Sequence, residues 1–387
     1  MTVVRSERNL ALDASSMMTP RSIPFFPYPE IFRAHEEELL GVMAGVCRRG
    51  AFILQKECEE FESNLAEFMG VEHAFGVANG TDAIIIGLKA AGIGPGDEVI
   101  LPSHTYIATA AAVHMVGATP VLAECGPDHM LDASDVARRI TVKTRAIMPV
   151  QINGRTCDMD AIDAVAREEG LIICEDAAQA LGSRFKGQSA GTFGLFGTLS
   201  FYPAKLLGCF GDGGAVVTND DEVAERIALL RDHGRNEHGM VVAWGYNSRL
   251  DNLQAAILDF KLKLFPQEIE RRRAIAAMYQ EGMGDLESLT LPPAPDTDPS
   301  HFDVYQNYEL EADRRAELRA HLEQRGVQTI IQWAGTPVHQ FGELGFSVSL
   351  PKTDAFFQRC LMLPLNVALS DDDVAYVVDS VRNFYED

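Results

Sequence analysis

From residue 73 to residue 219 the sequence alternates short apolar runs with amphipathic stretches. The apolar runs predict strands at 73–78, 97–102, 118–124, 145–152 and 171–176. The stretches between them predict helices at 82–92, 107–117, 134–140 and 159–170. Near-continuous apolar strands separated by helices favour a mostly parallel sheet covered on both faces. Ligands bind such sheets beyond the carboxyl ends of the strands, so residues just after each strand are the first site candidates.

The second half of the chain predicts a smaller domain after a long helical region. Residues 251–283 are strongly helical, and Pro266 is expected to break or kink that stretch. Residues 292–300, PPAPDTDPS, are typical of an irregular connector. Beyond the connector we expect a strand in 301–311, a helix at 314–326, a strand at 327–333 and a last helix after the SDDD sequence at 370–373.

The predicted fold class is therefore α/β, with a large domain around a mostly parallel sheet and a smaller C-terminal α+β domain. We expect residues 1–22 to be a poorly ordered extension, 23–265 the large domain, and 266–387 the small domain with its linking helix.

Composition excludes several classes of function. The formal net charge is −23, without a long run of Lys and Arg, which argues against binding nucleic acid or anionic membranes. No apolar run is long enough to span a bilayer, and the first 20 residues lack the apolar core of a signal peptide. The 7 cysteines form no CxxC pair. We therefore expect a cytoplasmic protein with reduced thiols and no metal centre.

Three segments carry candidate chemistry, and each also has a purely structural interpretation. The apolar run 171–176 ends in Asp176, which is well placed to meet a ligand or to cap the next helix. Lys205 lies between a strand-like run and a glycine-rich stretch, where a desolvated amine would be nucleophilic; a surface lysine is the alternative. Residues 77–84, VANGTDAI, would present a helix N-terminus to a phosphate, or simply be a helix cap.

Together, these segments indicate a pyridoxal 5'-phosphate (PLP) site. This cofactor needs a lysine, an acid at its pyridine nitrogen and an anion site for its phosphate. Asp176 precedes Lys205 by 29 residues, and the predicted sheet would bring both to one edge with residues 79–82.

The chain resembles the DegT/StrS family of PLP-dependent sugar aminotransferases, which have the aspartate aminotransferase-like fold type I. The resemblance runs from IPFFP at 23–27 to the C-terminus. It is carried in order by GVANGTDAI, GPGDEVILPSHTYIATA, PVQINGRTCDMDAI, EDAAQALGS, GTFG, SFYPAKLLGCFGDGGAVVTND and GYNSRLDNLQAAIL.

The resemblance implies roles for the cofactor residues. Lys205 resembles the family's Schiff-base lysine, Asp176 the acid at the pyridine nitrogen, and Gln179 a residue near the ring hydroxyl. The remaining implied contacts are to the phosphate from Gly80, Thr81 and Ser200, and to the ring face from Tyr106, for which a core aromatic is the alternative.

It also implies a homodimer with shared active sites. Asn247 resembles the residue that reaches the phosphate in the neighbouring subunit, and Arg249 would hold an anionic part of the substrate or form an ion pair with Asp251. His339 would touch substrate or be structural. Trp333 stands with Ala334 and Gly335 where many relatives have a tyrosine and prolines, a departure that bears on the substrate. The two histidines in 233–239 are interpreted as part of a mobile loop.

The function implied is transfer of an amino group from L-glutamate to a keto sugar, through pyridoxamine 5'-phosphate (PMP). The sugar is expected to be nucleotide-linked, with a 3-keto group favoured over a 4-keto group. A sugar dehydratase of the same family would have histidine in place of Lys205. A non-catalytic regulator would need a basic face or a DNA-binding helix-turn-helix, and a dinucleotide oxidoreductase would need GxGxxG spacing that residues 208–214 lack.

Overall fold

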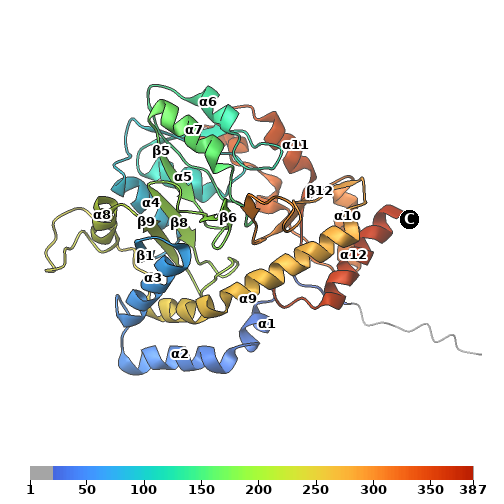
Figure 1. Ribbon diagram of the computed structural model, residues 1–387, viewed down its shortest axis with the longest axis horizontal. Coiled ribbons are helices and arrows are strands. Elements are labelled where there is room, and N and C mark those ends of the chain that lie inside the picture. Colours follow the sequence, from blue (N-terminus) through green and yellow to red (C-terminus); the bar gives the residue numbers. More distant parts are fainter. Residues whose placement is uncertain (1–20, 387) are drawn as a thin grey trace, which may run out of the picture.

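The computed structural model describes residues 21–386 and contains the expected mostly parallel sheet (Figure 1). The sheet has 7 strands in the order β1-β9-β8-β5-β4-β2-β3. Only β9 runs antiparallel to its neighbours; the β8-β5, β5-β4, β4-β2 and β2-β3 pairs are parallel. In spatial order the strands are β1 (His73–Val77), β9 (Gly214–Thr218), β8 (Phe196–Ser200), β5 (Ile172–Asp176), β4 (Thr144–Ile147), β2 (Glu98–Pro102) and β3 (Thr119–Ala123).

Helices cover both faces of this sheet, as the apolar strands require. One face packs against α4 (Gly80–Ala90), α5 (Ile107–Met115) and α8 (Asp221–Arg231). The other face packs against α3 (Lys56–Met69), α6 (Ala133–Arg139), α7 (Met159–Glu169) and α9 (Asn252–Met283). The strands and helices expected between residues 73 and 219 are therefore confirmed, with ends that differ by a few residues.

The long helix α9 continues through Pro266, so the break expected there is wrong. A proline inside a helix costs roughly 3 kcal/mol. Phe265 and Ile269, on either side of it, are buried against the large-domain core, and this packing offsets the lost hydrogen bond. Further along, Tyr279 and Met283 belong to the core of the C-terminal part. We therefore propose that α9 links two domains, with the change of core between residues 269 and 275.

The C-terminal part contains a small antiparallel sheet of β10 (Leu289–Thr290), β12 (Tyr308–Ala312) and β13 (Cys360–Leu363). Helices α10 (Arg315–Gln324), α11 (Pro351–Arg359) and α12 (Asp371–Glu386) accompany it. A further small sheet joins β6 (Arg184–Phe185), β7 (Gln188–Ser189) and β11 (His301–Phe302). The expected helices at 314–326 and after 370 are confirmed.

The strand expected at 327–333 is wrong. Val327 and Ile330 each make a single β-bridge, to Ile23 and Met362, and the chain then enters a 3-10 turn at Gln332–Gly335. Two successive residues with positive φ, Trp333 at 46° and Ala334 at 57°, prevent an extended strand there.

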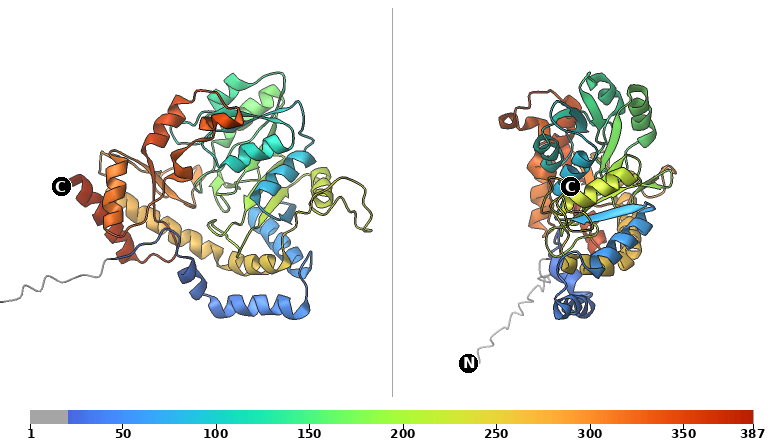
Figure 2. Two further views of the ribbon diagram at one scale, coloured as in Figure 1. Left: turned by 180° about the vertical axis from the view of Figure 1, so that it is seen from behind. Right: turned by 90° about the vertical axis from the view of Figure 1, so that its left-hand side faces the viewer.

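The segment after residue 20 packs against the C-terminal part of the chain, although it was expected to open the large domain. Ile23 is buried in the C-terminal core, and Arg21 forms an ion pair with Asp373 at 2.9 Å. Residues 1–20 of the expected extension lie outside the described residues. Helices α1 (Tyr28–Arg33) and α2 (Glu36–Arg49) follow, and α2 lies beside α9 in both views (Figures 1 and 2).

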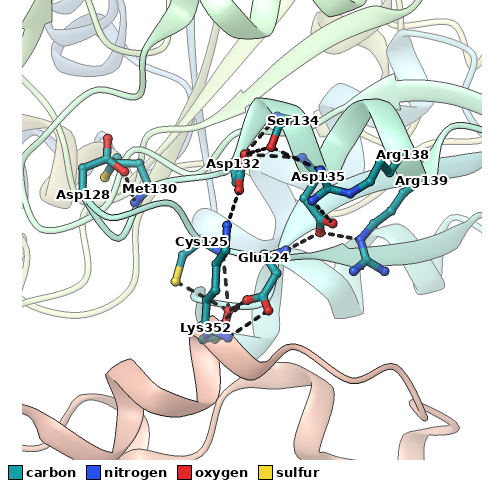
Figure 3. Close-up of polar contacts among 11 residues, drawn as sticks. Glu124, Cys125, Asp128, Met130, Asp132, Ser134, Asp135, Arg138, Arg139 and Lys352 are labelled. Carbon is teal, nitrogen blue, oxygen red and sulfur yellow. Dashed lines mark hydrogen bonds and ion pairs between the residues drawn. The ribbon is translucent and has the colours of Figure 1, made fainter.

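A buried acid joins the two parts of the molecule at the end of β3 (Figure 3). Glu124 accepts hydrogen bonds from the backbone N–H groups of Lys352 and Thr353, each at 2.9 Å, and from the Thr353 hydroxyl at 2.7 Å. It therefore caps the N-terminus of α11, where a negative charge is favoured. Nearby, Lys352 Nζ pairs with Asp132 at 2.9 Å.

All seven cysteines are free thiols, and six of them are buried, as expected. Between residues 21 and 386 there is no helix with the length and apolar character needed to cross a bilayer. The same residues contain no cluster of His, Cys, Asp and Glu suited to a metal ion.

Candidate active site

Asp176 lies at the carboxyl end of β5 with its side chain buried. Its Oδ2 accepts a hydrogen bond from the Thr109 hydroxyl at 2.7 Å, and its Oδ1 accepts one from the Ala178 N–H at 3.1 Å. Burial raises the pKa of Asp176, against the smaller lowering effects of these bonds and of the Lys205 charge. No ion pair to Asp176 forms within residues 21–386. A buried carboxylate of this kind is suited to bind a cationic group of a ligand.

The neighbouring acid, Glu175, points to the opposite side of the strand and has a structural role. Its carboxylate accepts bonds from Gln151 Nε2 at 2.7 Å and from the N–H groups of Gly191, Phe193 and Gly194 at 2.8, 2.6 and 3.1 Å. Successive residues of a strand face opposite sides of the sheet. Glu175 therefore binds the loop at 191–194, while Asp176 faces the candidate site.

Lys205 lies in the loop after β8, close enough to Asp176 for their charges to interact. Burial lowers the pKa of Lys205 to about 8, and the Asp176 charge opposes that effect. Gln306 holds the loop on both sides of the lysine: its Oε1 accepts from the Leu206 N–H and its Nε2 donates to the Ala204 carbonyl, both at 2.8 Å. The loop therefore places a nucleophilic amine beside a buried acid.

We expect this pKa to be visible in the cofactor-free chain. The neutral amine is the reactive form, so Lys205 should gain reactivity toward an amine-directed reagent as the pH rises through about 8. Exposed lysines should gain it only near their ordinary value of about 10.4. The measurement is labelling at a series of pH values followed by peptide mapping. A midpoint for Lys205 equal to that of the exposed lysines would contradict the buried geometry.

The N-terminus of α4 faces the end of β8. Asn79 caps the helix, its Oδ1 accepting from the Asp82 N–H at 2.8 Å. Gly80 lies so close to Ser200 that a Cβ at Gly80 would come within 2.8 Å of the Ser200 Cβ. Gly80, Thr81 and Ser200 are thus gathered at one point, each partly accessible. A helix N-terminus with a nearby hydroxyl favours an anion such as phosphate.

Two further predicted residues lie at strand ends. Tyr106 directly precedes α5 and is 57% exposed, so the alternative of a core aromatic is wrong. Gln179 follows Asp176 by three residues, and its Oε1 accepts a hydrogen bond from the Asn153 N–H at 3.0 Å.

Asn247, predicted to reach the phosphate in the neighbouring subunit, and Arg249 and His339, predicted to contact substrate, have different surroundings. Asn247 is exposed, in a segment that makes a β-bridge with Asp232. Arg249 pairs with Asp232 at 2.8 Å, so the suggested Asp251 pairing is not the one formed. His339 is buried, and its ring nitrogens contact Ser103 Oγ at 2.8 Å and Asp354 Oδ1 at 3.0 Å. Both nitrogens are thus engaged within the chain, and we propose a structural role for His339 in place of the expected substrate contact.

Sequence reasoning missed three residues that support the site: Thr109, Asn153 and Gln306. Thr109 lies within the IATA run, and only the sheet brings its hydroxyl to Asp176. Asn153 and Gln306 act through contacts with distant residues, for which a single sequence has no signal.

The residues present fit PLP. A buried carboxylate that forms no ion pair with the residues described here, a desolvated lysine whose charge interacts with it, and a helix N-terminus with a serine hydroxyl match the ring nitrogen, the aldehyde and the phosphate of that cofactor. Fold and site together define a PLP-dependent enzyme of the aspartate aminotransferase type.

The chain belongs to the DegT/DnrJ/EryC1/StrS aminotransferase family, whose model matches residues 33–382. It is 42% identical over 379 residues to the dTDP-3-amino-3,4,6-trideoxy-alpha-D-glucose transaminase of Streptomyces venezuelae, covering 96% of this chain and 98% of that protein. The crystal structure of S. venezuelae DesV in complex with a ketimine intermediate is similar with a TM-score of 0.91 and 41% identity, covering 95% of this chain and 100% of the other. Bacillus subtilis NtdA, solved with bound PMP, has a TM-score of 0.87 and 27% identity, covering 95% of this chain and 86% of the other.

Proposed function

We propose that the protein aminates a nucleotide-linked 3-keto sugar, with L-glutamate as the amino donor and 2-oxoglutarate as the co-product. The observation that carries the proposal is the near full-length similarity to a dTDP-3-amino sugar transaminase, together with a lysine at position 205 whose charge interacts with that of Asp176. That lysine speaks against the dehydratase alternative. A 4-keto sugar remains the second candidate substrate. The free thiols support a cytoplasmic reaction.

Each site residue has a proposed task. Bound PLP supplies an electron sink for the bond that breaks at the donor's α-carbon. Asp176 stabilises the protonated ring nitrogen. The Lys205 amine accepts the proton from the α-carbon and returns it on the cofactor side, which suits a pKa near the working pH. Gly80, Thr81 and Ser200 bind the phosphate, and Tyr106 stacks on the ring.

The reaction can be tested in the reverse direction with a defined probe. The protein, loaded with PLP, is mixed with dTDP-3-amino-3,4,6-trideoxy-α-D-glucose and 2-oxoglutarate, and L-glutamate is measured. Glutamate formation is expected, and a 4-amino-4,6-dideoxy analogue should react more slowly. Glutamate formed only from the 4-amino sugar would move the assignment to 4-keto sugars, and none from either would contradict the proposed sugar class.

We also propose a homodimer with shared active sites. The segment before Asn247 is exposed and apolar, with Trp244 97% and Val241 69% accessible. Apolar surface of this kind marks a protein contact. Asn247 would reach the phosphate bound by the partner subunit, while Arg249, through Asp232, would hold the segment in place.

Complementation tests the shared site. Lys205→Ala chains and Asn247→Asp chains should each be nearly inactive, the second because a carboxylate would repel the phosphate. After unfolding and refolding together, activity should rise toward roughly a quarter of the wild-type value, because about half of the dimers are mixed and each has one intact site. Mixed dimers without recovered activity would show that Asn247 acts within its own subunit.

A further inference from the structure

Glu309 is a buried acid on β12, outside the residues assigned to the cofactor. Its neighbours Tyr308 and Leu310 face the small-domain core, so Glu309 faces the large domain. Removing a carboxylate from water is costly unless donors surround it. The donors around Glu309 are therefore the evidence for what it does.

Three side chains from separate segments converge on the Glu309 carboxylate. Asn153 Nδ2 donates to Oε2 at 2.6 Å. With its amide nitrogen facing the acid, Gln332 donates to both carboxylate oxygens at 2.9 Å. His104 Nε2 lies 3.4 Å from Oε2 and makes no hydrogen bond within residues 21–386. Asn153 and His104 follow strands β4 and β2 of the large sheet, so the carboxylate holds parts of both domains.

Asn153, which bonds Glu309, also bonds Gln179. Asn153 has a positive φ of 55°, a conformation that asparagine tolerates but that needs support from its surroundings. Its side chain bonds Glu309, and its own N–H fixes the Oε1 of Gln179. The Gln179 Nε2 has no acceptor among residues 21–386. Glu309 thus helps determine where an unpaired amide N–H group points.

Gln332, which also bonds Glu309, is the first residue of the turn at 332–335, where many relatives have a tyrosine and prolines. Trp333 and Ala334 both have positive φ, a backbone conformation that is strained for residues with a side chain. The turn is held by Gln332 on Glu309 and by the Trp333 ring, which packs against His104 and Phe357 with centroid distances of 5.5 and 6.2 Å. A strained turn persists only while such anchors hold.

We propose that Glu309 is a positioning residue that sets, through Asn153, the amide of Gln179 at the cofactor and, through Gln332, the 332–335 turn. The inference rests on the proposed function in so far as Gln179 is assigned to the cofactor ring. The Glu309 carboxylate would thus fix two features at the same time: the Gln179 amide at the cofactor site and the turn around Trp333, where the sequence differs from many relatives.

The test compares Glu309→Gln with Glu311→Gln. Glu311 lies on the same face of β12 two residues on, and contacts His129 and Arg359 instead of Asn153. In Glu309→Gln an amide N–H group replaces one acceptor and faces two donors. We expect the visible absorbance of bound PLP to shift and its Kd to rise about tenfold, within the range of one charge-assisted hydrogen bond. Hydrogen exchange in 332–335 should also rise in the cofactor-free chain. Glu311→Gln should leave all three unchanged.

Gln332→Ala distinguishes the effect of Glu309 on the 332–335 turn from its effect on Gln179 through Asn153. It removes the 3.2 Å bond from Gln332 to Asn153 Oδ1, but that oxygen still accepts from Asn307, and Asn153 keeps its bonds to Glu309 and Gln179. Exchange in the turn should therefore rise while the absorbance of bound PLP stays that of the wild type. A folded Glu309→Gln protein with wild-type PLP absorbance and exchange would overturn the inference, as would equal effects from Glu311→Gln. These readouts need no sugar: if the wild-type protein aminated no sugar but Glu309→Gln still shifted the PLP absorbance, the proposed substrate would fail and the positioning role would stand.

Discussion

Replacing Lys205 with alanine is expected to lower transamination by more than about 10³-fold, because one change removes both the attachment point and the proton-transferring base. The variant should fold normally and still bind PLP without a covalent bond, since Asp176 and the N-terminus of α4 remain. The measurement is L-glutamate formation in the assay above, alongside the PLP content of the purified protein.

Lys261 is the matched control for this variant. Burial also lowers the pKa of Lys261, but its amine donates to the Gly208 carbonyl from α9, and Glu268 is the first of the charges that act on it. Lys261→Ala should retain covalently held PLP and most of its turnover. If Lys205→Ala kept turnover, or Lys261→Ala lost the covalent cofactor, the assignment of the nucleophile would be wrong.

Replacing Asp176 with asparagine is expected to lower the rate by about 10²–10³-fold, the usual effect of losing one charge-stabilising partner in a catalytic site. The amide cannot stabilise a protonated ring nitrogen. Burial already raises the pKa of Asp176, so the charged form is disfavoured in the cofactor-free chain. The neutral variant should therefore unfold at a temperature no lower than that of the wild type, which thermal melts of both cofactor-free chains can measure.

Replacing the neighbouring acid, Glu175, is expected to lower stability and not the reaction rate. Glu175→Gln should destabilise the fold by about 1–3 kcal/mol, because each carboxylate oxygen accepts from two donors and the amide N–H group would face two of the four. Turnover per folded molecule should stay near that of the wild type. A Glu175 variant with the kinetic defect, and an Asp176 variant without it, would reverse the roles of the two acids.

The apolar pattern of the sequence was sufficient to predict the helices and strands that lie near each other along the chain. The alternation between residues 73 and 219 predicted the sheet, because buried parallel strands and their covering helices leave a local apolar signature. Lys205 and Asp176 followed from their places next to strands. Pro266 was misjudged because the helix is held by core packing, which overrides the local cost. The turn at 332–335 was misjudged because apolar residues alone also fit a strand.

Contacts between segments far apart in the sequence could not be predicted from the sequence. Arg249 could not be matched to Asp232, and His339 could not be matched to Ser103 and Asp354, because surface pairs and buried networks have no fixed spacing. Glu309 and Glu311 alternate with apolar residues along β12, which is typical of a strand with one solvated face, and only the contacts across to Asn153 and Gln332 explain why Glu309 is buried. Such polar networks between domains require coordinates.

Covalent attachment of the cofactor to Lys205 is the feature on which the proposed chemistry depends most. The direct measurement is reduction of the PLP-loaded protein with borohydride, followed by proteolysis and mass spectrometry of the peptides. We expect one modified site, on the peptide that contains Lys205, and a loss of that label when the protein is first treated with excess L-glutamate to release the lysine. Label on any other lysine, or its absence from the Lys205 peptide of a yellow, active protein, would contradict it.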